Sequence, residues 1–297
     1  MTTSLPHPTA SGKSTVLALG AIALWGSLAP LGMLLVHVPP FLLTGLGLLV
    51  GSLIALPLSG GKFSAVRVPL GTLALGVYGL FGFHFLLFIA LRHAPPVQAN
   101  LVNYLWPLGI VLMTPLFLPG MRLHVLHIAA AFLGFGGAAL AILGGRDDAL
   151  QGGLAWGYIP ALASAFVWAS YSLLTQRVPP FRSAAIGLFG LVSGGLSLLC
   201  HVLLEPVVTL SIGDWVLIVA MGLGPLGAAF YLWDAALKRG DARQIGVLSF
   251  LTPLLSTLAL LWVRSEPPSL SVALAAAMII GAAVLGSRAK VTQEIGR

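Results

Sequence analysis

The sequence has little charge. Only 8% of its 297 residues are Asp, Glu, Lys or Arg, whereas 58% are hydrophobic. A water-soluble domain of this length needs more polar side chains to cover its surface, so the solvent of this chain must be mostly lipid. The composition therefore excludes a sizeable soluble domain.

The chain also lacks the residues of a redox or nucleotide site. Its single cysteine, Cys200, lies in an apolar stretch, so no disulfide can form within the chain, and we interpret the thiol as a small buried hydrophobe. Gly12-Lys13-Ser14 resembles the end of a P-loop, but the first glycine of that motif would fall at His7. We therefore expect no cofactor and no metal.

Ten apolar runs fill nearly the whole chain, and each has about the 20 residues that a helix needs to cross a bilayer. Polar or proline breaks separate them. They lie near residues 14–35, 40–58, 69–91, 97–118, 122–143, 155–176, 183–204, 213–236, 242–263 and 268–287. The sequence therefore predicts an all-α polytopic membrane protein of ten transmembrane helices.

Basic residues set the orientation of these spans. Arg92, Arg146 and Arg264 fall outside if the N-terminus is cytoplasmic. The other twelve of the fifteen Lys and Arg residues then fall on the cytoplasmic side: Lys13, Lys62, Arg67, Arg122, Arg177, Arg182, Lys238, Arg239, Arg243, Arg288, Lys290 and Arg297. The positive-inside rule therefore predicts a multi-pass protein of the inner (plasma) membrane with both termini in the cytoplasm. Because the cations are scattered singly, we expect no nucleic-acid partner.

The spans form an internal repeat. A shift of 143 residues places Trp25 and Ser27 on Trp168 and Ser170. A shift of 146 aligns Ala90, Leu91, Gln98, Leu105, Pro107 and Leu108 with Ala236, Leu237, Gln244, Leu251, Pro253 and Leu254. We therefore predict a duplicated five-helix unit. Its repeats are expected over 14–146 and 147–287, with cytoplasmic tails at 1–13 and 288–297.

Each predicted unit has an odd number of spans. The second copy must therefore enter the membrane from the side opposite to the first. The two repeats are then inverted about an axis in the membrane plane, which is an architecture typical of secondary transporters.

Two runs carry a resemblance to one transporter family. They are Leu24-Trp25-Gly26-Ser27, and Ala90-Leu91-Arg92 followed by Gln98 and by Asn103-Tyr104-Leu105-Trp106-Pro107-Leu108. Over essentially its whole length the chain resembles the EamA-type branch of the drug/metabolite transporter (DMT) superfamily. The likeness is closer to the YddG-type aromatic amino-acid exporters, in which an Asn-Tyr-Leu-Trp-Pro run opens the fourth helix. The resemblance implies ten helices around a central cavity and export of aromatic amino acids or related amphipathic metabolites.

Matching prolines point to the binding site. Proline disrupts a helix, and in lipid the freed backbone groups must find partners or line a wet cavity. Pro107 in span four and Pro253 in span nine are equivalent, and paired interrupted helices are the best sequence pointer to a transporter's site and to its gating bends. A packed kink away from substrate is the alternative.

Polar residues follow one face of span four. They are Asn100, Asn103, Tyr104 and Pro107, which have the i, i+3, i+4, i+7 spacing, with Trp106 beside them. An amide-rich stripe facing lipid is unfavourable. These side chains either bond neighbouring helices or bind a ligand that has a ring and a zwitterionic end. Ser249, Phe250 and Thr252 are the expected substrate-binding counterpart in the second half.

Span three offers Tyr78, Phe81 and His84 along a glycine-rich helix. His84 is an ionisable group deep within a span, and such residues mark functional sites. A histidine changes charge near neutral pH. It could bind the substrate carboxylate, relay a proton or remain a neutral structural residue.

Span six contributes Trp168, which shares a helix face with Ser164 and Tyr171. We expect Trp168 and Tyr171 to contact substrate, with packing between the halves as the alternative. Asp234 lies four residues before Lys238, so an interfacial i, i+4 ion pair is expected, and coupling to protons is the alternative.

The sequence therefore predicts a secondary transporter that works by alternating access. Its expected partners are an aromatic amino acid or amphipathic metabolite and the lipid bilayer, and the chain is expected to act as a monomer. Export of other amino acids, drugs or metabolites is the alternative. A membrane-embedded enzyme would need clustered His, Asp or Glu within the spans, where only the isolated His84 and Asp234 occur, so we expect no enzyme.

Overall fold

The structure is a computed structural model that describes residues 12–144 and 155–295. Within these ranges the chain is helical and contains no β-strand. The α-helices are α1 (Gly12–Gly26), α2 (Leu28–Leu34), α3 (Pro40–Ser52), α4 (Ala55–Ser59), α5 (Leu70–Val77), α6 (Phe83–His93), α7 (Pro96–Asn103), α8 (Trp106–Phe117), α9 (Val125–Leu143), α10 (Tyr158–Leu174), α11 (Ile186–Leu204), α12 (Ile212–Leu223), α13 (Ala229–Leu237), α14 (Ala242–Leu248), α15 (Leu251–Arg264) and α16 (Leu270–Ile295). Shorter turns are the 3-10 turns η1 (Phe63–Ala65) and η3 (Ser183–Ala185) and the π-helical turns η2 (Tyr78–Gly82) and η4 (Gly224–Ala228).

These helices make ten apolar segments. In the part of the chain that is described, nine are long and apolar enough to cross a bilayer, and the 17-residue α10 is a shorter apolar helix. Each lies within a few residues of its predicted run, so the prediction of ten transmembrane helices is confirmed. The predicted boundary between the repeats, at residues 146 and 147, lies outside the described residues, as does most of the predicted N-terminal tail.

Irregular turns occur at equivalent positions in the two halves. A shift of 146 residues places η2 on η4 residue for residue. The same shift places the break between α7 and α8, at residues 104–105, within one residue of the break between α14 and α15, at residues 249–250. A π turn interrupts regular helical hydrogen bonding and is frequent at functional sites. The halves are therefore copies of each other down to their interruptions.

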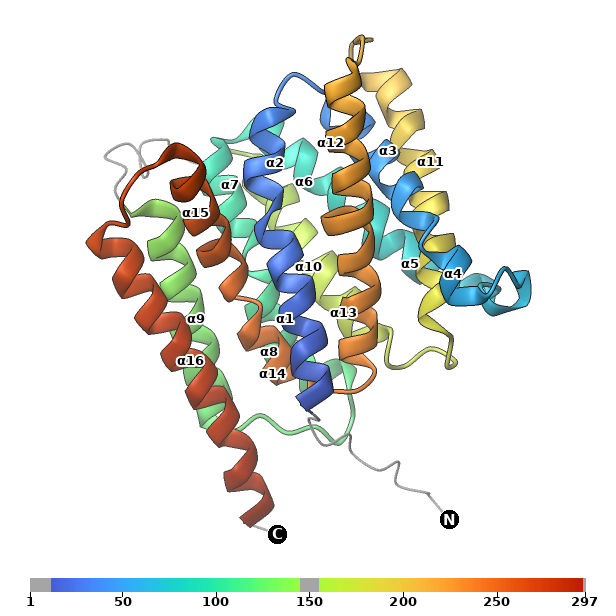
Figure 1. Cartoon of the computed structure of the whole chain (residues 1–297). Helices are drawn as coiled ribbons and strands as arrows, with labels where there is room; N and C mark the ends of the chain where they lie inside the picture. The colour runs from blue at the N-terminus through green and yellow to red at the C-terminus, as the bar shows by residue number, and fades with distance from the viewer. Residues whose placement is uncertain (1–11, 145–154, 296–297) are drawn as a thin grey trace.

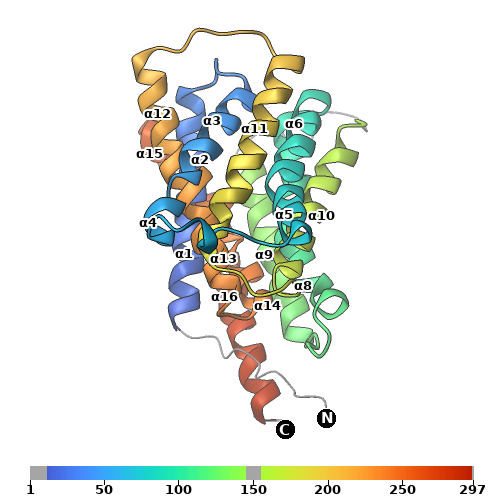
Figure 2. The same cartoon turned by 90° about the vertical axis from the view of Figure 1, so that its right-hand side faces the viewer.

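The helices pack in pairs that the repeat relates. α3 packs on α11 and α9 packs on α16, as Figure 1 shows, so span two meets span seven and span five meets span ten. α1 packs on α13 and α6 packs on α10, so the first span of each half meets the third span of the other. The start of α1 and the end of α16 lie at one end of the bundle (Figures 1 and 2), which we call the termini end. We call the opposite end the far end.

Glycines let spans of different halves approach closely. A Cβ atom on Gly51 of α3 would lie 2.7 Å from the Cα of Gly227 and 2.8 Å from the carbonyl oxygen of Gly222. A Cβ atom on Gly79 would lie 2.3 Å from the ring of Tyr171. Lipid tails are as apolar as the helices, so tight packing of small residues takes the place of a hydrophobic driving force. These contacts hold the two halves together.

A buried carboxylate joins the halves at the far end. The side chain of Glu205, at the end of α11, is 0% exposed. It accepts hydrogen bonds from the backbone N–H groups of Phe41 (3.0 Å) and Leu42 (3.2 Å) in the first turn of α3. Arg92 donates to it at 2.8 Å and the His201 Nδ1 at 3.0 Å. Glu205 thus caps a helix N-terminus, where a negative charge is favourable, and links spans two, three and seven.

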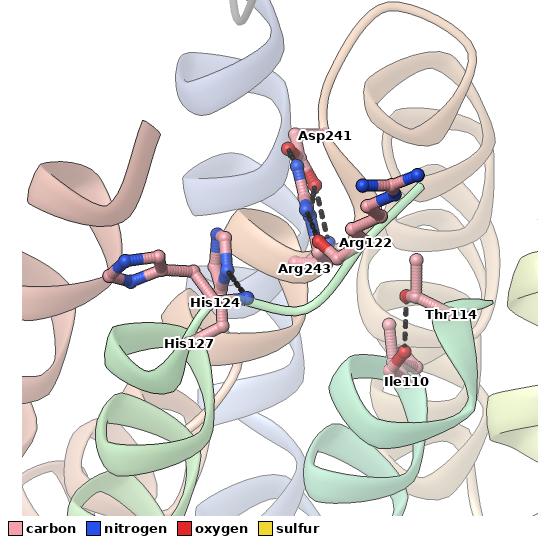
Figure 3. Close-up of polar contacts among 7 residues, drawn as sticks. All are labelled: Ile110, Thr114, Arg122, His124, His127, Asp241 and Arg243. Atoms are coloured by element: carbon pink, nitrogen blue, oxygen red, sulfur yellow. Dashed lines mark hydrogen bonds and ion pairs between the residues drawn. The ribbon is translucent and has the colours of Figure 1, made fainter. Parts of the chain in front are cut away.

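A second buried ion pair lies at the termini end (Figure 3). Asp241 caps α14 by accepting from the backbone N–H of Arg243 at 2.8 Å, and the Arg243 Nη2 lies 2.6 Å from the other Asp241 oxygen. Both side chains are at most 8% exposed. Arg243 Nη1 also donates to the carbonyl of Arg122, between α8 and α9. The pair therefore ties the start of span nine to a loop of the first half.

Cation–aromatic contacts follow the repeat as well. Arg92 and Lys238, which the 146-residue shift aligns, lie 5.5 Å and 3.5 Å from the ring centroids of Phe41 and Phe181. Lys238 Nζ also lies 2.6 Å from Asp234 Oδ2, which confirms the predicted i, i+4 ion pair. Equivalent residues thus make equivalent contacts at opposite ends of the bundle.

Substituting Gly51→Ala should destabilise the protein by about 1–3 kcal/mol, because the new Cβ meets backbone atoms that cannot move aside cheaply. Gly195→Ala is the matched control, since a Cβ there meets nothing within 4 Å. Thermal unfolding in detergent measures both. Equal melting temperatures for the two variants would show that span two is not packed as described.

Asp241 should make stability depend on pH. Burial raises its pKa, but the hydrogen bonds and charge of Arg243 outweigh burial and hold the pKa below its ordinary value of 3.8. A carboxyl with a lowered pKa stabilises the fold above its ordinary pKa, and that contribution is lost as the pH falls through the lowered value. Thermal unfolding measured from pH 6 down to pH 3 should therefore show a loss of stability. The Asp241→Asn/Arg243→Met double variant should lack this loss.

The single variant Arg243→Met leaves Asp241 buried without its cation, so it should be less stable than the wild type by about 3–5 kcal/mol at neutral pH. The double variant should recover part of this loss, because Asn also caps helices well. A single variant as stable as the wild type would contradict the described ion pair.

Candidate functional site

A cavity of ≈ 440 Å³ lies between the two halves, in the volume range of small-molecule sites. Spans one, two, three, four, six, eight and nine contribute to its wall. Its lining residues are Trp25, Leu28, Ala29, Gly32, Pro40, Leu43, Thr44, Phe83, His84, Leu87, Phe88, Leu91, Asn100, Asn103, Tyr104, Trp106, Trp168, Met221, Leu226, Phe230, Thr252 and Ser256. None of these described residues is Asp, Glu, Lys or Arg, and the side chain among them that can gain a positive charge is His84.

The cavity extends from the middle of the bundle toward the far end. Its walls include Gly32 near the end of α2, Pro40 at the start of α3 and Leu91 near the end of α6. The end of α2, the start of α3 and the end of α6 lie at the far end in Figure 1. Toward the termini end the described lining includes Phe230, the second residue of α13, but no residue from the first turn of α1 or the last turn of α13. The cavity therefore reaches toward the far end and stops short of the termini end.

Three indoles, those of Trp25, Trp106 and Trp168, line the cavity, and a fourth, that of Trp233, packs behind them. The Trp25 ring centroid lies 6.3 Å from that of Trp106, 5.7 Å from Trp168 and 5.2 Å from Trp233, with edge-to-face or tilted planes. Trp233 is 1% exposed and donates its Nε1–H to Ser172 Oγ at 3.1 Å. Such pairs pack favourably beyond the area they bury. The indoles separate the cavity from the termini end.

The polar part of the wall comes from interrupted helices. α7 presents Asn100, Asn103 and Tyr104 to the cavity, and α15 presents Thr252 and Ser256. The carboxamide of Asn103 is bonded to the Ser164 hydroxyl at 2.8 Å, which fixes its position. Two elements of opposite halves thus place uncharged hydrogen-bonding groups on facing walls.

His84 follows the π turn η2 and offers one polar atom to the cavity. Its Nδ1 lies 2.6 Å from the carbonyl oxygen of Leu80. A carbonyl only accepts, so Nδ1 carries a proton, and in the neutral ring Nε2 is then a hydrogen-bond acceptor. The rings of Phe83 and Phe230 pack against the imidazole at centroid distances of 5.1 Å and 6.2 Å. In its neutral form His84 thus offers one hydrogen-bond acceptor in an aromatic pocket.

Seven of the twelve residues that the sequence singled out line the cavity: His84, Asn100, Asn103, Tyr104, Trp106, Trp168 and Thr252. The other five, Tyr78, Phe81, Tyr171, Ser249 and Phe250, are not among the lining residues. Ser249 bonds the carbonyl of Ile245 at 2.7 Å, and Phe250 fills the space beside Gly134. Tyr171 packs on Gly79, Tyr78 bonds Ser170 at 2.8 Å, and Phe81 packs on Phe85.

The two prolines lie directly after the helix breaks. Pro107 is the second residue of α8 and Pro253 the third residue of α15, and both are buried. Neither is a lining residue. At the first turn of a helix a missing N–H is tolerated, because the helix leaves its first N–H groups unpaired anyway. The prolines therefore mark where each half-helix begins.

Some lining residues were not singled out from the sequence. Thr44 in span two, Ser256 in span nine and Phe230 in span eight carry no motif and sit in ordinary apolar runs. Phe230 could have been found as the repeat mate of His84, since 84 and 230 differ by the 146-residue shift. In the described ranges no group of three or more His, Cys, Asp or Glu could hold a metal ion.

Comparison with known proteins agrees with this architecture. The EamA-like transporter family is matched twice, by residues 12–143 and by residues 155–288. The chain is 41% identical over 284 residues to the aromatic amino acid exporter YddG of Ancylobacter novellus, covering 93% of this chain and 97% of that protein. It is 27% identical over 292 residues to the aromatic amino acid exporter YddG of Escherichia coli, covering 92% and 96%.

A solved crystal structure has the same fold. It superimposes with a TM-score of 0.84 at 40% sequence identity, over 93% of this chain and 96% of that one. The family matches one region in each five-span half, as the repeat requires. The chain belongs to the EamA-like transporter family.

Proposed function

We propose that this protein exports aromatic amino acids across the cytoplasmic membrane by alternating access. The observation that carries the proposal is the wall of the cavity, which combines three indoles with uncharged hydrogen-bonding groups. Indole and phenyl rings pack favourably on a flat aromatic ligand. A wall without Lys, Arg, Asp or Glu favours a ligand whose charges cancel, such as a zwitterionic amino acid. The two relatives named as aromatic amino acid exporters support the same substrate class.

The positive-inside rule supports placing the termini end in the cytoplasm. The cavity then faces the exterior, as in an exporter that has released its substrate. To load the next molecule, the halves must close the far end and open a path past Trp25 and Trp233. The paired π turns and helix breaks are the places where the spans bend most easily.

In this mechanism His84 binds substrate rather than relaying a proton. Its Nε2 accepts a hydrogen bond, and the amino acid's ammonium group is the donor that matches it. No Asp, Glu, Lys or Arg is among the described lining residues, so no carboxylate or amine in the cavity wall could exchange a proton with His84. The same scarcity of acids and bases argues against a membrane-embedded enzyme.

Two other transport functions compete with this proposal. Export of small aliphatic amino acids would leave the indole walls without a ring to contact. Export of cationic amphipathic compounds would use cation–π contacts but would leave the polar wall without a carboxylate. Tryptophan, threonine and a flat organic cation, tested side by side in proteoliposomes, distinguish the three.

Replacing Trp106 by Ala should lower tryptophan counterflow in proteoliposomes at least tenfold, because the cavity wall loses one of its three indoles and ring packing contributes about 1.4 kcal/mol or more. Asn103→Ala should lower it as well, since the polar wall loses its amide. Trp262→Ala is the matched control, because Trp262 is 82% exposed on the outside of α15. Tryptophan flux that is equal in Trp106→Ala and Trp262→Ala would refute the site.

A further inference from the structure

One terminal atom of the Asn103 amide is open to the cavity. The residue is 4% exposed and lines the cavity. The other terminal atom of the amide lies 2.8 Å from the hydroxyl of Ser164 on α10. The open atom has no hydrogen-bond partner in the described chain, yet it is not among the fully buried side-chain atoms that lack one. Its identity decides what the amide can bind, because oxygen accepts a hydrogen bond and nitrogen donates one.

Ser164 determines which atom is open. The residue is 0% exposed, and its Oγ lies 2.7 Å from the carbonyl oxygen of Ala161 and 2.8 Å from Asn103 Oδ1. A hydroxyl has one proton and both neighbours are acceptors, so one of these short contacts has no proton between its oxygens. A half-turn of the Asn103 carboxamide, which hardly changes its shape, removes the conflict. Nδ2 then donates to Ser164 Oγ, and Ser164 Oγ donates to Ala161.

The half-turned amide is the more stable orientation. Both short contacts become hydrogen bonds, and each buried hydrogen bond contributes about 0.5–1.5 kcal/mol, whereas two oxygens in contact without a proton repel each other. Asn103 Oδ1 then faces the cavity as an acceptor. The Nε2 of His84, on α6, is a second acceptor in the same wall, and α6 packs on α7. Neighbouring spans of the first half thus both offer acceptors to a ligand.

We infer that Asn103 Oδ1 accepts a hydrogen bond from the α-ammonium group of the exported amino acid, and that Ser164 positions the amide for this contact. The inference rests on the proposed function and assigns the ammonium group to the first half, with His84 Nε2 as the second acceptor. An ammonium group has three donors and no acceptor, so it matches such a wall. A carboxylate only accepts, so it is excluded from this part of the cavity.

Phenylalanine counterflow in proteoliposomes tests the assignment, because phenylalanine has no indole N–H that could bind the same oxygen. Asn103→Leu removes the acceptor, keeps a side chain of similar size and leaves the bond from Ser164 to Ala161 intact. The KM for phenylalanine should rise about tenfold or more, the effect of losing a hydrogen bond to a charged group. L-phenylalaninol keeps the ammonium group and lacks the carboxylate, so its affinity as a competitor should fall as much. The affinity of 3-phenylpropionate, which lacks the ammonium group, should change less than about threefold.

A second variant, Ser164→Ala, tests the positioning and leaves Asn103 in place. Without the Ser164 hydroxyl the amide can present either terminal atom to the cavity. Phenylalaninol should then bind more weakly and 3-phenylpropionate more tightly, whereas a merely structural role of Ser164 would shift both competitors in the same direction. Ser193→Ala is the matched control, because Ser193 is also 0% exposed, makes no side-chain hydrogen bond within the described chain and does not line the cavity.

The two competitors also identify the opposite arrangement, in which Asn103 donates to the carboxylate. Asn103→Leu would then weaken 3-phenylpropionate as much as phenylalanine and leave phenylalaninol unchanged, and this result would overturn the ammonium site. Phenylalaninol that does not compete in the wild type would overturn it as well. A wild type that moves neither phenylalanine nor tryptophan would instead overturn the proposed function.

Discussion

Every backbone N–H and C=O group inside the hydrocarbon must be satisfied within the protein, and the rest of this structure depends on that constraint. A helix satisfies it along its length, so a break in a helix is tolerated only where protein or a water-filled cavity surrounds it. Spans four and nine break at equivalent positions, and residues beside both breaks line the cavity. The cavity is therefore located where the helices are interrupted.

The two halves are held together by contacts of different kinds at different depths. Glycines such as Gly51 and Gly79 bring the spans together in the middle of the bundle. Charged groups act at the ends, where Glu205 joins α11 to α3 and α6, and Arg243 joins α14 to the loop before α9. A transition that closes the far end and opens the termini end must loosen the contact of Arg243 with the loop before α9. Because it is a pair of buried charges, its opening is favourable only if water reaches it.

The sequence predicted the architecture well because that architecture depends on length and order. Apolar runs of about 20 residues define the spans, and an odd number per repeat dictates the inversion. Which individual side chains point into the cavity was harder to predict. Ser249 and Phe250 were expected in the cavity, but the Ser249 hydroxyl bonds the Ile245 carbonyl of its own helix and Phe250 packs beside Gly134 of α9. Tyr171 was placed by a helical face, yet the missing side chain of Gly79 draws it into the seam.

The π turns could not be predicted from hydrophobic periodicity, which assumes 3.6 residues per turn. Each π turn adds a residue to a helical turn and so rotates the next part of the helix, which decides that His84 and Phe230 face the cavity. Trp25 was visible in the sequence as a motif residue, but its place at the centre of four indoles depends on three other spans. Such contacts come from tertiary packing alone.

The most direct test of alternating access compares two positions on α1 and α2 that flank Trp25. Ala29 lines the cavity, whereas Ala18 is 0% exposed on the side of the termini end. Each is replaced by cysteine in a Cys200→Ala background and probed in whole cells and inside-out vesicles with a membrane-impermeant thiol reagent. We expect position 29 to react from the exterior and to be protected by tryptophan, and position 18 to react only from the cytoplasmic side and faster during transport. Reaction of both positions from the same side, with or without tryptophan, would contradict a cavity that two inverted halves open alternately.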